Sequence, residues 1–247
     1  MCATCGCGQS EGAGHSHEHG HEHSHEHPHE HGEEGRRVVV EQALLAENDR
    51  LAAYNKGYFD GRHIRCLNLI SSPGSGKTTL LEKTLAALLA KGAACSVIEG
   101  DQATDLDAQR IARTGAPVVQ IETGRACHLD AHQIHHALEK LSPPPNSLLF
   151  IENVGNLICP TEFQLGEHER VTVLSVTEGA DKPAKYPLAF RSATAVVINK
   201  MDLMPYVDFD LKEVRRLITG LNPKAAIFEL SARTQDGLSA WLDWLRR

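Results

Sequence analysis

The stretch Ser71-Ser72-Pro73-Gly74-Ser75-Gly76-Lys77-Thr78-Thr79 decides the fold of this chain. An apolar run over residues 67–70 precedes it, and a leucine-rich segment over 80–89 follows it. A buried strand, a loop of small residues and a helix that begins at Lys-Thr form the arrangement of a phosphate-binding P-loop. Small residues let backbone N–H groups close around phosphate oxygens, and the helix N-terminus adds partial positive charge. We therefore expect the phosphates of a nucleotide to bind at Gly74, Ser75, Gly76, Lys77, Thr78 and Thr79.

Two side chains of this loop have separate expected roles. Lys77 is expected to reach the β- and γ-phosphates, and the Thr78 hydroxyl is expected to ligate Mg²⁺. The loop departs from the usual pattern at Ser71, which stands where a glycine normally opens the motif. A glycine-rich turn without a ligand is the alternative, but it does not explain Lys-Thr-Thr at the start of a helix.

The composition is that of a soluble globular protein. The 247 residues are 41% hydrophobic and 23% charged with a formal net charge of −7, so the chain can bury a full core and nucleic acid is not expected as its main partner. No apolar run reaches the roughly 18 residues of a transmembrane helix, and the N-terminus does not resemble a secretory signal. We therefore expect no membrane partner and a cytoplasmic location. Seven cysteines, three of them among the first seven residues, indicate metal binding more than disulfides.

The chain divides by composition into three parts. Residues 1–36 carry a cysteine motif and then histidine at every second position from His15 to His31, and we expect this tail to be disordered without metal. Residues 37–60 have helical spacing and are expected to dock as a helix on the main domain. Residues 61–247 alternate apolar strands with helices, which predicts an α/β P-loop NTPase fold with a mostly parallel sheet flanked by helices.

The elements expected in this last part can be placed by their apolar patterns. After the strand at 67–70, further strands are expected at 94–99, 118–121, 148–151, 171–176, 195–198 and 225–230. Helices are expected at 105–114, 129–141, 210–220 and 238–245. Ligands of such sheets bind at the carboxyl ends of the strands, so the loops that follow the strands should contain the functional residues.

A guanine nucleotide is predicted from the loop after the strand at 195–198. That loop begins Asn199-Lys200-Met201-Asp202, and the Asp202 carboxylate can accept hydrogen bonds from both N1–H and the exocyclic amine of guanine. Adenine has no such pair of donors on that edge. Ser231 and Ala232 follow the last strand and resemble the loop that supports the base. GTP and GDP are therefore the expected ligands.

The carboxylates that hold Mg²⁺ are expected at neighbouring strand ends. Asp101 lies in Glu99-Gly100-Asp101, and Glu152 follows the strand at 148–151. Together with Lys77 they are the predicted catalytic residues, because a carboxylate there can also position the attacking water. Asp107 is a weaker candidate. The alternative for each carboxylate is a solvated loop residue or a helix cap.

Three further groups indicate a second metal chemistry. Cys2, Cys5 and Cys7 lie on a flexible, glycine-containing segment and can chelate one soft ion such as Ni²⁺, although a terminus with merely reactive thiols is the alternative. The histidine tract can store Ni²⁺ or Zn²⁺ by multivalent binding. The glutamates between its histidines, and its position after a cysteine motif, argue against a purification tag.

The third group lies inside the predicted domain. Cys127 and His128 are expected to open the helix at 129–141, and Cys159 follows Glu152 in the next loop. Two loops at one sheet edge can bring these three ligands together, and a second subunit can complete a four-coordinate ion. The alternative is that the cysteines are small buried hydrophobes. His132 is an outside candidate for this site, His135 and His136 are expected to be solvated, and Cys66 and Cys95 are expected in the core.

These motifs together resemble the family of hydrogenase nickel-incorporation GTPases known as HypB. The resemblance covers nearly the whole chain outside the histidine tract, including the cysteine motif, the P-loop, and the segments 99–101, 127–131, 152–160 and 199–202. It implies a SIMIBI-class GTPase that forms a homodimer with GTP and delivers nickel to the precursor of the hydrogenase large subunit, with a HypA-type metallochaperone as partner. It also implies a nickel site at Cys2, Cys5 and Cys7, and a nickel or zinc site at Cys127, His128 and Cys159.

Two other functions stay open from the sequence. One is a related maturation GTPase that serves urease or a cobalamin enzyme, against which the cysteine motif and the segment Asn156-Leu157-Ile158-Cys159-Pro160 argue. The other is a nickel storage and buffering protein in which the nucleotide only controls dimerisation. If the chain works as a nickel-delivering GTPase, we also expect the bound nucleotide to influence the metal site, because Glu152 and Cys159 share one loop.

Overall fold

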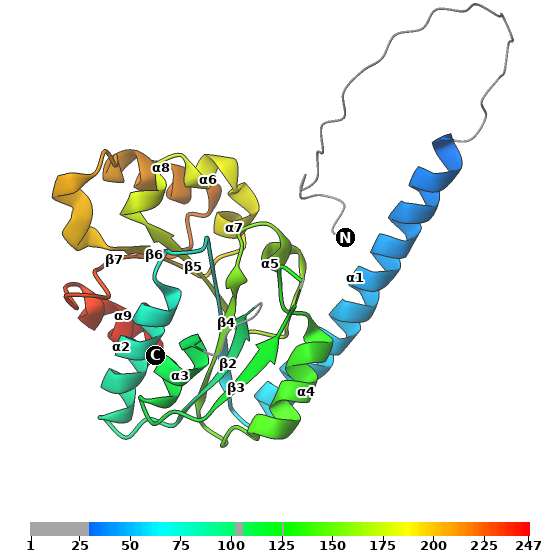
Figure 1. The fold of residues 1–247 in the computed structure, drawn as a ribbon, viewed down its shortest axis with the longest axis horizontal. Helices are drawn as coiled ribbons and strands as arrows, with labels where there is room; N and C mark the ends of the chain where they lie inside the picture. The colour runs from blue at the N-terminus through cyan, green and yellow to red at the C-terminus, as the bar shows by residue number, and fades with distance from the viewer. Residues whose placement is uncertain (1–29, 102–105, 125) are drawn as a thin grey trace, which may run out of the picture. The chain divides into compact units, whose positions relative to one another are not determined.

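A computed structural model describes residues 30–247 apart from 102–105 and 125, and up to residue 41 it describes the backbone alone. A parallel sheet forms the centre, with strand order β3-β2-β4-β1-β5-β6-β7 (Figure 1). The strands are β1 (Arg65–Ser71), β2 (Cys95–Asp101), β3 (Val118–Glu122), β4 (Leu148–Gly155), β5 (Glu169–Ser175), β6 (Ala195–Asn199) and β7 (Ala226–Glu229). The predicted class, a P-loop NTPase fold with a parallel sheet between helices, is confirmed.

Helices cover both faces of this sheet. They are α1 (Glu30–Gly61), α2 (Lys77–Leu89), α3 (Leu106–Ala112), α4 (Ala131–Leu141), α5 (Cys159–Glu162), α6 (Lys182–Lys185), α7 (Pro187–Arg191), α8 (Leu211–Leu221) and α9 (Leu238–Leu245), with 3₁₀ helices η1 (Val176–Glu178) and η2 (Met201–Tyr206). No helix among the described residues is long and apolar enough to cross a lipid bilayer.

The central strands are buried on both faces, which explains their continuous apolar runs. On one face, β1 and β4 pack against α2 and α9, where Leu85 and Trp241 are fully buried. On the other face, α1 contributes Phe59 and α4 contributes Ile134 to a second buried cluster. A third cluster joins β5 and β6 to α7 and α8. The sheet is therefore a rigid support for the loops at its carboxyl edge.

Strand register brings three functional segments to one edge. β1, which leads into the P-loop, lies beside β4, and β4 lies beside β2. Leu69 of β1 and Glu99 of β2 both pair with Glu152 of β4. The chain thus places the P-loop, Glu99 and Glu152 next to one another, although they are far apart in sequence.

Two described helices begin two or more residues away from their predicted starts. α1 begins at Glu30 instead of residue 37. α4 begins at Ala131 instead of residue 129, because Asp130 caps it: the carboxylate of Asp130 accepts from the backbone N–H of Gln133, 2.8 Å away, in a capping box. The prediction that Cys127 and His128 open this helix is therefore wrong, and both lie in the loop before it.

The short helices α5, α6 and α7 and both 3₁₀ helices were not predicted, because segments of three to six residues are too short to show a helical apolar period. Residues 40–247 form one compact unit that is separate from 1–39, with the division inside α1. The boundaries proposed at residues 36 and 60 remain a prediction.

The burial of two core thiols has a measurable consequence. Burial raises the pKa of Cys66 well above its usual range and that of Cys95 to about 11. We expect iodoacetamide at pH 8 to leave both thiols unmodified in the folded protein and to modify both in urea. Peptide mass spectrometry measures the extent of modification, and half-buried Cys127 is the accessible reference.

The same shifts set a pH dependence. Since the unfolded chain loses thiol protons near pH 8.5 and the folded chain keeps them to a higher pH, the free energy of unfolding should fall as the pH rises above about 8.5. Alkylation of Cys95 in the folded protein as fast as in urea would contradict both predictions, because the thiol would then ionise as readily as in the unfolded chain.

Candidate nucleotide and metal sites

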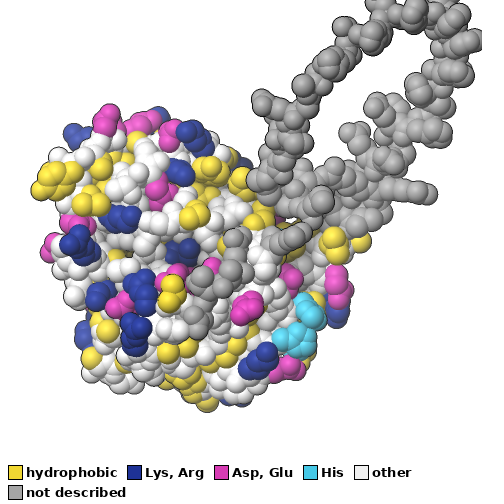
Figure 2. All heavy atoms as spheres, in the orientation of Figure 1, with side chains coloured by type: hydrophobic (Ala, Val, Ile, Leu, Met, Phe, Trp, Pro, Cys, Tyr) yellow, Lys and Arg dark blue, Asp and Glu magenta, His cyan; other side chains and the backbone are white. Residues whose placement is uncertain are grey.

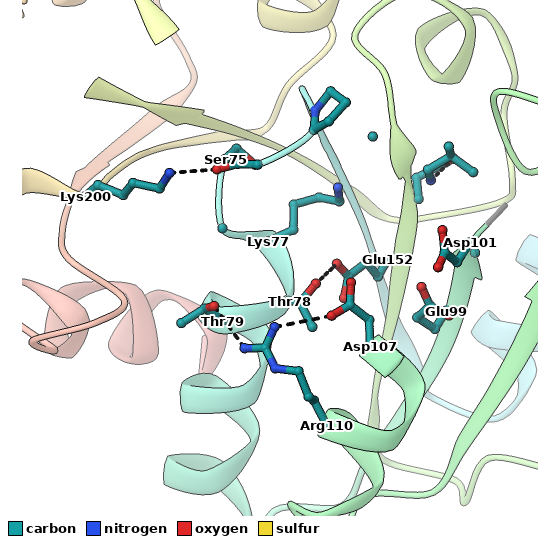
Figure 3. Close-up of a pocket in the computed structure, with 17 residues that line it drawn as sticks. Ser75, Lys77, Thr78, Thr79, Glu99, Asp101, Asp107, Arg110, Glu152 and Lys200 are labelled. Atoms are coloured by element: carbon teal, nitrogen blue, oxygen red, sulfur yellow. Dashed lines mark hydrogen bonds and ion pairs between the residues drawn. The ribbon is translucent and has the colours of Figure 1, made fainter. Parts of the chain in front are cut away.

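A cavity of about 560 Å³ opens at the carboxyl ends of β1, β2 and β4 (Figure 3). Its wall comes from the P-loop, from the end of β2, from α3 and from the end of β4, with the Lys200 side chain at one side. The predicted residues Gly74, Ser75, Gly76, Lys77, Thr78, Thr79, Asp101 and Glu152 all line it. The predicted base-binding residues Asp202, Ser231 and Ala232 do not.

The P-loop is held in shape by the loop after β6. Gly74 and Gly76 have φ angles of 76° and 93°, in the left-handed region that favours glycine. The Asn199 side-chain amide donates to the carbonyl of Ser75 at 2.9 Å, and Lys200 Nζ donates to the carbonyl of Gly74 at 2.7 Å. A Cβ atom on Gly76 would lie 2.6 Å from Asn199 Nδ2. Glycine is therefore required at this position for both the backbone angle and the close contact.

The unusual Ser71 has a defined partner. Lys77 Nζ donates to the Ser71 hydroxyl at 2.9 Å, and that hydroxyl donates to the carbonyl of Ser72 at 2.7 Å. Burial lowers the pKa of Lys77, although nearby Glu152 opposes this effect. The serine thus gives the buried ammonium group a hydrogen-bond acceptor inside the cavity.

Carboxylates gather on the opposite wall (Figure 3). Thr78 Oγ1 donates to Glu152 Oε1 at 2.6 Å. The second oxygens of Glu152 and Glu99 are buried and have no hydrogen-bond partner among the described residues. Burial raises the pKa of Glu152, and burial followed by the charges of Glu152 and Asp101 raises that of Glu99 to about 8.

These side chains fit a magnesium ion. Mg²⁺ prefers oxygen ligands, and buried carboxylate oxygens without partners are stabilised by a cation. Thr78, Asp101 and Glu152, the ligands predicted from the sequence, all offer oxygen atoms at the cavity wall, and their role as Mg²⁺ ligands stays a prediction. Glu99 was missed, because its place beside Glu152 comes from the register of β2 on β4 and not from a motif.

Arg110 of α3 is a second residue that the sequence did not single out. Its guanidinium group donates to Thr79 Oγ1 at 3.0 Å, to Glu82 at 2.9 Å and to Asp107 at 3.2 Å. It therefore ties the start of α2 to α3 at the mouth of the cavity. Asp107 pairs with this arginine, which accounts for its position without a metal.

The predicted base-binding loops are joined by Asn199. Its side-chain oxygen accepts from the backbone N–H of Ala232 at 2.9 Å and of Lys200 at 2.8 Å. Asp202 Oδ1 is buried and has no hydrogen-bond partner among the described residues. A buried carboxylate oxygen without a partner can accept the hydrogen bond that N1–H of guanine donates.

Cys127, His128 and Cys159 come together in one chain. Their ligand atoms all lie within 4.8 Å of one another, with 2.8 Å between the two sulfurs and 3.8 Å between Cys127 Sγ and His128 Nδ1. The two cysteines are not joined in a disulfide. The His128 ring stacks on Phe163 with centroids 3.9 Å apart, which fixes its plane. Two thiolates and an imidazole suit Zn²⁺ or Ni²⁺ and leave one position open for a further ligand.

Helix α1 holds the two segments that carry these ligands. The amide of Asn48 donates to the carbonyl of Gln164 at 2.8 Å, and its oxygen accepts from the N–H of Ala131 at 2.9 Å. Asn55 donates to the carbonyls of Ala131 and Leu165 at 2.8 and 3.2 Å. Each asparagine therefore bridges the start of α4, which follows His128, to the segment after α5, which Cys159 opens.

The remaining metal candidates lie elsewhere. The group of Cys127, His128 and Cys159 does not include His132, His135 or His136. Cys66 and Cys95 are buried in strands. The cysteines Cys2, Cys5 and Cys7 and the histidine tract up to residue 29 lie outside the described residues.

Comparison with known proteins gives a consistent result. The sequence profile of the CobW/HypB/UreG nucleotide-binding domain matches residues 66–229. The hydrogenase maturation factor HypB of Azotobacter chroococcum is 50% identical over 214 residues, which cover 87% of this chain and 70% of the relative. The Escherichia coli K12 protein of the same name is 50% identical over 210 residues, which cover 85% of this chain and 72% of the relative.

A solved structure agrees with the sequence relatives. The crystal structure of HypB from Helicobacter pylori in complex with nickel is 40% identical and has a TM-score of 0.76. The match covers 81% of this chain and 93% of the Helicobacter pylori chain. The resemblance inferred from the motifs is confirmed.

The buried carboxylate Glu99 supports a pH prediction. Its pKa is raised from 4.5 to about 8, so between these values the folded, metal-free protein keeps a proton that the unfolded chain has lost. The free energy of unfolding must therefore fall as the pH rises through this range. We expect Glu99→Gln to remove that slope and to stabilise the nucleotide-free protein at pH 8 by about 1–3 kcal/mol, measured by urea unfolding. An unchanged slope would show that Glu99 is ionised in the folded protein.

The α1 asparagines support a second prediction. Asn55→Ala leaves the carbonyls of Ala131 and Leu165 without their donor, so it should lower the free energy of unfolding by about 1–3 kcal/mol. It should also weaken metal binding at Cys127 and Cys159 while nucleotide affinity stays unchanged. Tyr54→Ala, at an exposed position on the same helix, is the matched control. Equal metal affinity in both variants would mean that α1 does not position the ligands.

Proposed function

Because this chain belongs to the HypB family of hydrogenase maturation factors and is a GTPase, we propose that it uses GTP to control delivery of nickel to the precursor of a nickel–iron hydrogenase large subunit. One observation carries the proposal: the end of β4 lines the phosphate cavity and leads along the chain to Cys159, and Leu129, next to His128, contacts Gly100 and Asn153 at the cavity wall. A homodimer, a HypA-type metallochaperone and a cytoplasmic location are part of this proposal.

The cavity residues have clear chemical tasks in hydrolysis. Lys77 exchanges the Ser71 hydroxyl for phosphate oxygens and stabilises the charge that develops on the transferred group. Thr78, Asp101 and Glu152 would hold Mg²⁺, which neutralises the phosphates when bound. Glu152 is buried at the cavity wall, beside the place where the phosphates would lie. Asp101 or Glu152 then orients the attacking water.

Two contacts connect this cavity to the thiols. Gly100, between Glu99 and Asp101, lies against Leu129, so close that a Cβ atom there would be 2.8 Å from the leucine side chain. The Asn153 side-chain oxygen accepts from the N–H of Leu129 at 3.1 Å. Leu129 directly follows His128. A shift of either carboxylate segment on nucleotide exchange would therefore act on the loop that carries two of the metal ligands.

The thiols themselves must move when an ion binds. In a tetrahedral site with metal–sulfur bonds of about 2.3 Å, the two sulfurs lie about 3.8 Å apart. In the described chain this distance is 2.8 Å. Binding thus requires the two sulfurs to move apart by about 1 Å, and a nucleotide state that favours the wider separation would favour the cargo ion. Nickel is the proposed cargo, and zinc is a further proposed occupant of this site.

Nickel storage is a second candidate function. The alternating histidines of residues 15–31 favour it, because many imidazoles on one segment bind several ions. Maturation of urease or of a cobalamin enzyme is less well supported, since relatives at 50% identity are hydrogenase maturation factors.

Coupling can be tested by titrating Ni²⁺ into the full chain with Cys2→Ser, Cys5→Ser and Cys7→Ser, so that nickel–thiolate absorption reports on Cys127 and Cys159. We expect affinities in the GDP form and in the form with a non-hydrolysable GTP analogue to differ by about 5- to 150-fold. Adding Lys77→Ala, which weakens nucleotide binding, should reduce the difference. Equal affinities in both forms would refute the coupling.

The same lysine variant separates delivery from storage in cells. Lys77→Ala should abolish hydrogenase activity while the nickel content of the cells is retained, because the histidine tract is intact. Normal hydrogenase activity in cells with a hydrolysis-deficient chain would make storage the main function.

A further inference from the structure

We propose that a buried polar network positions the segment 159–163, which carries one thiol of the proposed metal site. The network consists of Asn153 in β4, Asn68 in β1, Glu167 in the segment before β5, and Arg170 in β5. Its hydrogen bonds run without interruption from the wall of the phosphate cavity to this segment. The positioning follows from the geometry alone, whereas its dependence on the bound nucleotide rests on the proposed function.

The ion pair in this network is buried, whereas charged side chains normally lie at the surface. Figure 2 shows lysine, arginine and acidic side chains spread over the molecular surface, where water solvates them. The side chains of Glu167 and Arg170 are only 4% and 5% exposed, and Glu167 Oε1 accepts from Arg170 Nη2 at 2.7 Å and from Nε at 3.0 Å. Because burying two charges costs solvation free energy, two apolar side chains of similar volume are often as stable. Stability alone therefore does not explain this pair.

The other hydrogen bonds of this pair hold the backbone that follows the start of α5. The guanidinium group of Arg170 donates to the carbonyl of Thr161 at 3.0 Å and to that of Phe163 at 3.3 Å. Glu167 Oε2 accepts from the N–H of Leu165 at 2.8 Å. One ion pair thus fixes three backbone groups of this short segment.

This backbone determines where two of the proposed metal ligands lie. Cys159 is the first residue of α5, and Thr161 lies in the same turn. The Phe163 ring stacks on the His128 ring, with centroids 3.9 Å apart. Fixing Thr161 and Phe163 therefore restricts both the Cys159 sulfur and the His128 imidazole. Residues that orient metal ligands in this way typically change metal affinity about 10- to 100-fold when they are replaced.

The opposite end of the network reaches the phosphate cavity. Asn153 lines that cavity beside Glu152, and its amide donates to Asn68 Oδ1 at 3.3 Å. The amide of Asn68 in turn donates to Glu167 Oε1 at 3.2 Å. Both amides thus donate in the same direction, toward the carboxylate of the ion pair. A displacement of Glu152 when the nucleotide changes would be transmitted through two hydrogen bonds to the pair.

Asn68 stands where the fold otherwise has apolar side chains. Alternate residues of a strand point to the same face of a sheet, so Asn68 shares its face with Cys66 and Ile70, which lie in apolar clusters. It is fully buried and pairs in register with Ile151 of β4 and with Arg170 of β5. A leucine would fill this position without the cost of burying an amide. The two hydrogen bonds of the amide account for the asparagine.

Replacing the ion pair tests the positioning, in the full chain whose three N-terminal cysteines are changed to serine. The double variant Glu167→Leu with Arg170→Met removes both charges, so neither remains buried alone. It should bind Ni²⁺ about tenfold or more weakly at Cys127 and Cys159 in both nucleotide forms, and its nickel–thiolate absorption band should shift. Arg170→Lys should have a smaller effect in the same direction, because one ammonium group keeps the charge but cannot donate to both carbonyls.

Asn68→Leu tests the connection to the cavity. It leaves the ion pair and its contacts in place, so Ni²⁺ affinity in the GDP form should stay within about threefold of the parent chain. The difference in affinity between the GDP form and the form with a non-hydrolysable GTP analogue should shrink about threefold or more, because two hydrogen bonds of the network are lost.

Arg65→Met with Glu169→Leu is the matched control. This ion pair also joins β1 to β5, with its atoms 3.1 Å apart and its side chains 25% and 23% exposed, and Arg65 donates to the carbonyl of Leu245 in α9. Its Ni²⁺ affinity and the dependence of that affinity on the nucleotide should equal those of the parent chain.

Parental Ni²⁺ affinity and an unshifted band in the double variant and in Arg170→Lys, with urea unfolding curves that show folded protein, would overturn the positioning role. If the double variant does not fold, Arg170→Lys alone decides this point. An unchanged nucleotide difference in Asn68→Leu would overturn the connection to the cavity. Equal affinities in the two nucleotide forms of the parent chain would contradict the proposed function, while the ion-pair variants still test the positioning.

Discussion

The side-chain amide of Asn199 makes three hydrogen bonds on which the nucleotide site depends. It donates to the carbonyl of Ser75 and accepts from the N–H groups of Ala232 and Lys200. Loops have no strand partners for their backbone groups, so a buried side chain that satisfies several of them also fixes how the loops lie relative to each other. The P-loop and both base-binding loops are thereby held as one unit before any ligand arrives, which lowers the entropy lost on binding.

Side-chain amides also order the loops around the proposed metal site. Asn48 and Asn55 of α1 satisfy backbone groups in the loop after His128 and in the loop after Cys159. Arg170, buried with Glu167, adds hydrogen bonds to the carbonyls of Thr161 and Phe163. Amide and guanidinium groups suit this purpose because each offers several donors in a fixed geometry. The domain thus has two ordered loop clusters, with Leu129 and Asn153 between them.

The sequence predicted the strands, the P-loop and the grouping of Cys127, His128 and Cys159 because these depend on local pattern and on the rule that parallel strands end at one edge. It could not predict Glu99 as a neighbour of Glu152, since strand register is a tertiary property. The bridging contacts of Asn48, Asn55 and Arg110 were also missed, because a single polar residue in a helical pattern looks like surface. Asp130 could have been recognised as a cap from Gln133 three residues later.

The sulfurs of Cys127 and Cys159 lie 2.8 Å apart in one chain and form no disulfide, which has a consequence for redox chemistry. A disulfide-containing oxidant can take two electrons from this pair, its own thiols taking up the two protons, and leave a sulfur–sulfur bond in place of two ligands. A bound ion prevents this reaction by occupying both sulfurs. At the proposed metal site, ion binding and oxidation are therefore alternatives, and reducing conditions would be needed to load it with metal.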